Sequence, residues 1–425
     1  MYPDWPESDA DLVPLPNCDG PKLKSFDFQG PQKIEFLEYL GEGLHAHVFK
    51  VKILGQVYAL KLFRFAYDHN WVGPASDTDP GNRELMSAFY NYSEPFSSEC
   101  RAFGRLQETG YEELAVRCFG YVLLDEEHEH TIMTQFSDLK LEFNGDIDYP
   151  GAEDMRSRFP GKDARAPPIR GVVKEFGLQD EENLGTTVVR KILRDVIKLQ
   201  QLGIIRIDVG TRQIIDDKLC DFSTAVTIPH FRTNPELNPH LTPEMICAIE
   251  LETFELSIND YLEFDEMIFD WNLEYADEKG RISVYAFPDG RGGRHKYNLR
   301  SRATKECAYT FVDPRKYDWR TYPTSVGASR KEVTRRRWSG RISKSGGHEN
   351  PQGVSSRIRR HLRARPPVWY YEYDSKLAKC SEWATPFSDW MDWDYKDGLM
   401  FPRIKKRFYI THQVSFARTR LGRPL

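Results

Sequence analysis

Two aspartates, Asp208 and Asp221, lie on either side of a short segment near the middle of this chain. Phosphoryl transfer needs one carboxylate near the nucleophile and another to hold magnesium, because the reaction depends mostly on positioning and charge neutralisation. An aspartate pair at this spacing would mean little by itself. It gains weight because two further parts of the same kind of site precede it, in the expected order.

The first part is a turn that contains Gly41 and Gly43, between predicted strands at residues 34–40 and 48–53. Glycine lets the backbone approach phosphate groups closely, because no Cβ stands in the way. Taken alone, such a turn favours a structural hairpin over a nucleotide-binding loop.

The remaining parts follow the turn. Val48 would cover the base of a bound nucleotide, and Ala59 and Lys61 belong to a third strand, from which the ammonium group can reach the phosphates. Glu99 lies in an amphipathic helix that begins near residue 96, and it could pair with Lys61, as phosphotransferases of this type require. A lone helix glutamate is more typical of a solvated surface. The order of glycine turn, lysine, glutamate and two aspartates favours the functional interpretation.

Residues 33–285 resemble the protein-kinase fold. In this resemblance Lys61 is the strand-three lysine and Glu99 the helix-C glutamate. Asp208 is the catalytic-loop aspartate, and Asp221-Phe222-Ser223 stands where kinases have Asp-Phe-Gly. A bilobal α+β fold is therefore expected, with a small β-rich N-lobe and a helical C-lobe.

Three segments, at 99–106, 172–176 and 221–230, resemble more specifically a fungal kinase-like family of inner-kinetochore (Sim complex) subunits. This resemblance implies protein complex partners and a nuclear location, with the cytoplasm as the alternative. It also implies ATP as a ligand, with backbone groups of Glu175 and Phe176 facing the adenine.

The kinase pattern is altered at the metal site. Asp221 and Gln213 are the implied Mg²⁺ ligands, and Gln213 stands where an asparagine is usual. Its amide oxygen is one methylene further out, and magnesium tolerates poor geometry badly. Arg206 replaces a histidine, and Ser223 replaces a glycine. Two functions therefore compete: an ATP-binding scaffold with weak or no phosphotransfer, and an active Ser/Thr-type protein kinase.

Hydrophobic periodicity adds further elements. It predicts helices over 184–202 and 245–276 and strands at 117–124, 131–136 and 169–176. Thr242-Pro243-Glu244 either anchors an activation segment or simply begins a helix. The predicted organisation has five parts: an N-terminal tail (1–32), an N-lobe with insertions and the hinge (33–176), a C-lobe (177–285), a basic flexible region (286–367) and an aromatic C-terminal segment (368–425).

Charge is distributed unevenly over the 425 residues. Residues 291–365 hold 21 Lys and Arg against 5 Asp and Glu, whereas the whole chain has a formal net charge of -5. Such asymmetry fits contact with DNA or another polyanion, a nuclear import signal, or a basic linker folded against the acidic body.

Membrane insertion and disulfide scaffolding are not expected. The sequence has no run of 18 apolar residues, and its N-terminus lacks the basic and apolar regions of a signal peptide. Seven cysteines without a CxxC pair argue against a disulfide framework and against a zinc site. An intracellular protein is therefore expected. The aromatic segment 368–425 either docks on the core or binds a partner.

Overall fold

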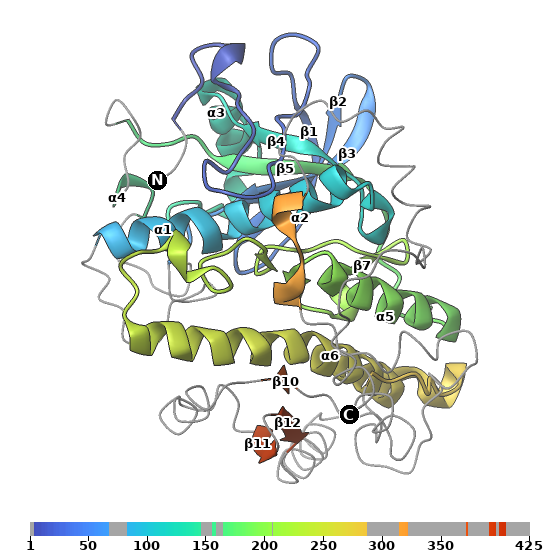
Figure 1. Ribbon diagram of the computed structural model, residues 1–425. Helices are drawn as coiled ribbons and strands as arrows, with labels where there is room; N and C mark the ends of the chain where they lie inside the picture. Colours follow the sequence, from blue (N-terminus) through green and yellow to red (C-terminus); the bar gives the residue numbers. More distant parts are fainter. Residues whose placement is uncertain are drawn as a thin grey trace, which may run out of the picture. The chain divides into compact units, whose positions relative to one another are not determined.

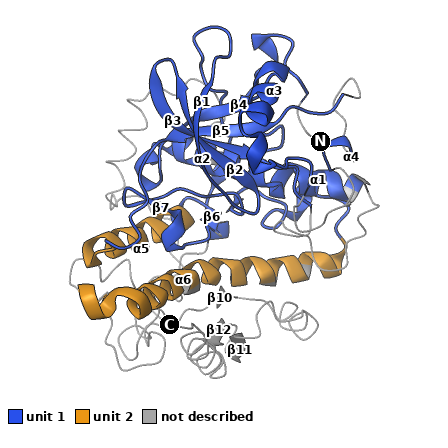
Figure 2. Ribbon diagram, turned by 180° about the vertical axis from the view of Figure 1, so that it is seen from behind, with its two compact units in different colours: residues 1–183, 201–241, 314–327 blue, residues 184–200, 242–313, 328–425 orange. Residues whose placement is uncertain are grey.

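The computed structural model describes residues 4–67, 83–145, 155–158, 165–205, 207–286, 314–321, 371–372, 391–396 and 399–404. The chain separates into two compact units that are discontinuous in sequence, shown in different colours in Figure 2. Unit 1 comprises residues 1–183, 201–241 and 314–327, and unit 2 comprises 184–200, 242–313 and 328–425. Residues 201–241, which include both aspartates of the predicted site, therefore cluster with the N-terminal sheet.

Unit 1 is built on a five-stranded antiparallel sheet with the order β1-β2-β3-β5-β4 (Figure 1). Its strands are β1 (Glu35–Glu42), β2 (Ala46–Ile53), β3 (Gln56–Phe63), β4 (Cys118–Leu123) and β5 (Arg170–Glu175). The helices of this unit are α1 (Arg83–Ser93), α2 (Pro95–Thr109), α3 (Glu126–Gln135) and α4 (Met155–Arg158). The described chain is thus α+β, with the sheet in its N-terminal region and the longest helix later.

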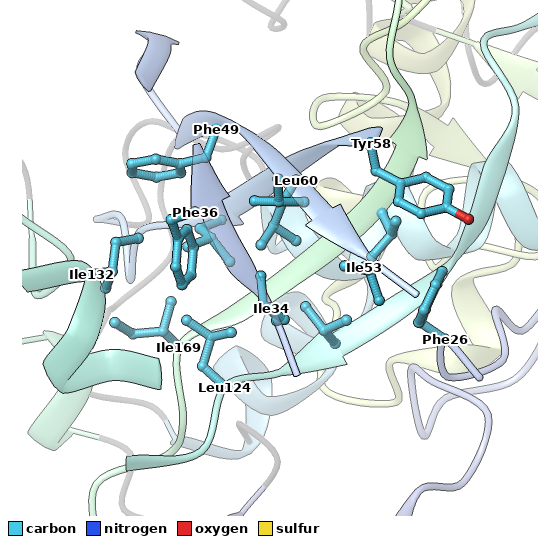
Figure 3. Close-up of a cluster of buried hydrophobic side chains, with 14 of the residues drawn as sticks. Phe26, Ile34, Phe36, Phe49, Ile53, Tyr58, Leu60, Leu124, Ile132 and Ile169 are labelled. Atoms are coloured by element: carbon cyan, nitrogen blue, oxygen red, sulfur yellow. The ribbon is translucent and has the colours of Figure 1, made fainter. Parts of the chain in front are cut away.

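One face of this sheet is apolar. Successive strand residues point to opposite faces, so Leu60 and Leu62 of β3 and Val173 of β5 all enter one buried cluster. Figure 3 shows Phe36, Phe49 and other members of the cluster gathered on this side.

The opposite face of the sheet lies against α2, which packs on β5. The Glu94 side chain accepts a hydrogen bond of 3.0 Å from the Ser97 backbone N–H, and Pro95 begins the helix. Gly110 ends it in the left-handed conformation, with φ of 70°. Because residues 95–106 are all buried, α2 is an internal helix rather than a surface helix.

The segment at 15–28, within the predicted N-terminal tail, is built into unit 1. Ser25 bridges Tyr121 of β4, and the Phe26 N–H donates to the Tyr121 carbonyl at 2.8 Å. Two glycines permit this contact. A Cβ on Gly104 would lie 2.6 Å from the Lys22 carbonyl oxygen, and one on Gly120 would lie 2.6 Å from the Phe26 nitrogen. The apolar face also depends on this segment, because Phe26 belongs to its cluster.

The predicted strand at 131–136 is wrong, because these residues lie in and just after helix α3. The Asp125 side chain caps this helix by accepting from the His128 N–H at 2.8 Å, and three glutamates in the first turn favour it electrostatically. Ile132 and Phe136, four residues apart, therefore both face the apolar cluster.

Short strands form two pairs after the sheet. Strand β6 (Ile204–Ile205) pairs with β9 (Val226–Thr227), and β7 (Ile214–Ile215) pairs with β8 (Lys218–Leu219). Asp216 and Asp217 have φ of 46° and 62°, as a tight two-residue hairpin requires. Short 3-10 helices lie at Asp9–Asp11, Glu112–Leu114, Ser137–Leu139, Thr211–Gln213, Pro235–Leu237, Pro314–Lys316 and Trp319–Thr321.

Unit 2 contains two long helices, α5 (Thr186–Gln201) and α6 (Pro243–Lys279), close to the predicted ranges. Gln200 joins them, because its side-chain amide donates to the Ser257 carbonyl at 2.6 Å and accepts from the Tyr261 hydroxyl at 2.7 Å. The Thr242 hydroxyl accepts from the Met245 N–H at 3.2 Å, so this residue caps a helix start.

The same unit contains a small antiparallel sheet with the order β10-β12-β11, formed by Tyr371–Glu372, Leu399–Ile404 and Met391–Lys396. The rest of the predicted aromatic segment, and all of the predicted basic region except residues 286 and 314–321, lie outside the described residues. Within the part of the chain that is described, no helix is long and apolar enough to cross a membrane.

Candidate functional site

Several predicted nucleotide-binding residues lie on the α2-facing side of the unit 1 sheet. Strand register places Gly41, Val48 and Lys61 in one cross-strand row. The next row contains Ala59, which is directly opposite Lys174 of β5. Because directly opposed residues share a face, Val48, Ala59 and Lys61 all lie on the side opposite the apolar cluster.

Lys61 connects the predicted glutamate and one of the two predicted aspartates. Its ammonium nitrogen lies 2.8 Å from Glu99 Oε2 and 2.6 Å from Asp221 Oδ1. The Glu99 side chain is fully buried, whereas that of Asp221 is 30% exposed. Three residues from distant parts of the sequence therefore form one charged group, and Asp221 is its exposed member.

A second lysine, Lys174, belongs to the same group. Its ammonium forms an ion pair with the other carboxylate oxygen of Glu99 and donates to the Cys220 carbonyl at 2.6 Å. Sequence reasoning assigned no role to it. The available signal was a lysine inside a strand whose pattern otherwise predicts burial, since a buried lysine needs a partner. Lys61, Lys174, Glu99 and Asp221 are hereafter the four-charge cluster.

The cluster strongly favours the ionised form of its exposed carboxyl. Burial alone would raise the pKa of Asp221, but the ammonium groups of Lys61 and Lys174 outweigh this effect and hold the pKa well below its ordinary value. Burial likewise tends to lower the pKa of Lys61, yet the carboxylates of Asp221 and Glu99 raise it above its ordinary value. Both groups therefore remain charged at neutral pH.

Asp208 and Gln213 contact each other. Asp208 has φ of 51°, an uncommon conformation for a residue other than glycine, and its side chain is 42% exposed. The Gln213 side-chain amide donates to its carboxylate, and Arg212 lies 3.4 Å away. The Gln213 Oε1 atom is buried and has no hydrogen-bond partner within the described residues. Arg206 lies outside the described residues.

At the predicted hinge, one backbone donor is already used. The Glu175 N–H donates to the Arg117 carbonyl at 2.8 Å, so Glu175 can offer an adenine only its carbonyl oxygen. Its side chain lies 3.3 Å from the Lys218 ammonium. The Phe176 ring lies 4.9 Å from the Lys50 ammonium.

The glycine turn contacts the segment around Asp221. Gly41 has φ of 145°, which explains the glycine at this position. His45 Nδ1 lies 3.1 Å from the Ser223 hydroxyl, and both side chains are buried. The Ser223 N–H in turn donates to Asp221 Oδ1 at 2.9 Å. The residue that replaces the usual glycine thus joins the turn to the exposed carboxylate, a contact that the sequence did not predict.

Two buried arginines of α2 hold the chain after Ser223. Arg101 donates to the Thr227 carbonyl at 2.9 Å and to the Asp19 carbonyl at 2.7 Å, and Arg105 donates to the Ile228 carbonyl. These contacts join the helix that carries Glu99 to the strand that follows Asp221. Sequence analysis missed them, because carbonyl partners leave no trace in residue identities.

The side chains at this site fit a divalent metal poorly. Asp221 Oδ1 already accepts from Lys61 and Ser223, and two ammonium groups balance the two carboxylates of the four-charge cluster. The unpartnered Gln213 oxygen is a neutral donor, which Mg²⁺ prefers less than carboxylate or phosphate oxygen. Within the described residues, no group of three or more His, Cys, Asp or Glu side chains could hold a metal ion. The residues present therefore do not fit a Mg²⁺ ion that protein side chains alone would hold tightly.

A known protein family matches this chain. The model of the family described as Kinetochore Sim4 complex subunit FTA2 matches residues 12–226, just over half of the chain. The chain belongs to this family. The match extends from the N-terminal segment built into the sheet to strand β9, so it includes the whole four-charge cluster. It confirms the kinetochore-subunit resemblance drawn from the sequence. No curated protein shows significant similarity to the chain.

Proposed function

We propose that this chain is a kinase-fold kinetochore subunit that binds ATP in unit 1 and acts mainly as a scaffold, with weak or no phosphotransfer. The observation that carries the ATP-binding part is the contact of Lys61 with both Glu99 and Asp221, at 2.8 and 2.6 Å. This contact fixes an ammonium group on the sheet face that also carries Gly41 and Val48. A fixed cation beside a glycine turn is the arrangement that a phosphate chain needs.

The scaffold part is supported by family membership and by the state of the catalytic residues. A kinetochore complex subunit has protein partners and works in the nucleus. Gln213 donates to Asp208, the residue that would orient an acceptor hydroxyl. Because the Asp208 carboxylate already accepts a hydrogen bond and Mg²⁺ fits the site poorly, ATP binding without rapid phosphotransfer is favoured.

An active protein kinase is the second candidate, and a specific observation favours it. All four catalytic-type residues are present: Lys61, Glu99, Asp208 and Asp221. The first two are paired as phosphotransfer requires.

The basic segment 291–365 supports a separate proposal, contact with DNA or another polyanion. A nuclear import signal is the alternative. A binding constant that does not change with salt would exclude the polyanion contact.

Calorimetric titration of the full chain with ATP tests the binding proposal. Wild type should bind, Lys61→Ala should bind at least about tenfold more weakly, and the exposed-site control Lys52→Ala should bind as wild type does. Lack of binding by wild type would contradict the proposal.

The Asp208→Asn variant then separates the scaffold function from the kinase function. It should still bind ATP, and it should rescue cells that lack the chain if the protein is a scaffold but not if it is a kinase.

A further inference from the structure

The formal charges of the four-charge cluster balance. Lys61 and Lys174 bring two positive charges, and Glu99 and Asp221 bring two negative charges. Without Lys174, the same site would be left with one ammonium and two carboxylates, a net negative group that repels phosphate unless a cation joins it. Lys174 supplies that positive charge from within the chain.

Lys174 is held in place on several sides. It is 6% exposed, and β5 places it diagonally across the sheet from Lys61, on the same face. Its ammonium contacts Glu99 and the Cys220 carbonyl and lies 5.2 Å from the Phe103 ring centre. These contacts fix the position of the Lys174 ammonium beside Glu99.

The two lysines contact different oxygens of one carboxylate, that of Glu99. Lys61 contacts Oε2 of Glu99, and Lys174 pairs with Oε1. Because Lys174 pairs with Glu99, the Lys61 ammonium can interact with an incoming anion while the buried Glu99 carboxylate keeps a partner. Leaving such a group unpaired would be costly.

We propose that Lys174 makes nucleotide binding at this site independent of divalent metal, so that the ligand is a metal-free nucleoside triphosphate. Lys174 is then a specificity-determining residue that acts through Glu99 and Lys61. The inference rests on the proposed ATP binding, and it goes further by naming the form of the ligand and the residue that selects it. It also gives a reason why the residues present do not fit a tightly bound Mg²⁺.

The test is calorimetric titration of the full chain with ATP, once with Mg²⁺ and once with EDTA. Wild type should show dissociation constants that agree within about threefold. The Lys174→Met variant, which keeps the length and loses the charge, should bind at least about tenfold more weakly in EDTA and recover affinity with Mg²⁺. Lys174→Arg, which keeps the charge, should bind ATP in EDTA more tightly than Lys174→Met does.

The outcomes separate this inference from the function on which it rests. Wild type that binds ATP only with Mg²⁺ would overturn the inference and leave the proposed ATP binding intact. Lys174→Met that stays metal-independent would also overturn it. If wild type binds ATP in neither medium, both proposals are wrong. The wild-type comparison tests metal independence without any variant, and the role of Lys174 is tested on variants whose folding circular dichroism has checked.

Discussion

The two faces of the unit 1 sheet hold neighbouring residues in opposite environments. Leu60 enters the apolar cluster, and Lys61, the next residue, enters the four-charge cluster beside α2. The apolar face is stabilised by the apolar surface that it buries and by close packing, so substitutions that conserve side-chain volume cost little stability there. The charged face is stabilised by pairing, so loss of a single partner leaves another buried charge uncompensated. One strand therefore supports two kinds of constraint, which mutation can separate.

The largest effect is expected from removing the carboxylate that two lysines share. Glu99→Ala leaves Lys61 and Lys174 without this buried partner, and it should lower the free energy of unfolding by about 3–5 kcal/mol. Urea denaturation measures this loss. Glu112→Ala, at an exposed position just after the same helix, should change stability by less than about 0.5 kcal/mol. A Glu99 variant as stable as this control would show that the cluster is not a buried ion group.

The matching change on the apolar face should affect stability alone. Leu60→Ala should cost about 2–5 kcal/mol because it leaves a cavity in the cluster. Leu60→Met, which nearly conserves volume, should cost less than about 1.5 kcal/mol. The affinity of the folded protein for ATP should stay unchanged in both variants. A change in affinity as large as that of Lys61→Ala would mean that the two faces are not independent.

Acid should weaken the charged face selectively. The pKa of Asp221 is lower in the folded protein than its ordinary value of 3.8. Its contribution to stability is therefore complete above about pH 4 and is lost as the pH falls toward the folded-state pKa. Denaturation midpoints measured from pH 6 to pH 2 should fall less steeply in Asp221→Asn than in wild type. If the midpoints of wild type and Asp221→Asn fell equally steeply with pH, the lowered pKa of Asp221 in the folded protein would be contradicted.

The smallest effect concerns helix α3, which covers part of the apolar face. Asp125→Ala removes the cap of this helix and should cost about 1 kcal/mol, whereas Asp125→Asn should retain most of the stability. Thermal denaturation would measure both. Equal midpoints for the alanine and asparagine variants would show that the cap contributes nothing.

Local patterns predicted most of the elements. The glycine turn and the strands on either side of it were predicted near their observed positions, and helices α5 and α6 were predicted within a few residues of their observed bounds. The error at 131–136 arose because this short segment was taken for a strand without regard to the helix cap at Asp125. In a segment this short, capping and the first-turn glutamates decide between helix and strand.

The contacts that distinguish this site were beyond sequence reasoning. Lys174 reaches Glu99, and His45 reaches Ser223, only because distant segments fold together. Arg101 binds backbone carbonyls, which every residue type offers. Periodicity gives the face on which a residue lies, but the partner it meets there depends on tertiary packing.

The central claim is that the charged face binds a nucleotide through Lys61, independently of the apolar face. The most direct measurement is the thermal unfolding midpoint of wild type, Lys61→Ala and Leu60→Met, each with and without ATP. At a hundredfold excess over its dissociation constant, ATP should stabilise the folded state by about 2.7 kcal/mol. The midpoint of wild type and of Leu60→Met should rise, and that of Lys61→Ala should rise by no more than about half as much. No rise in wild type, or an equal rise in Lys61→Ala, would contradict the claim.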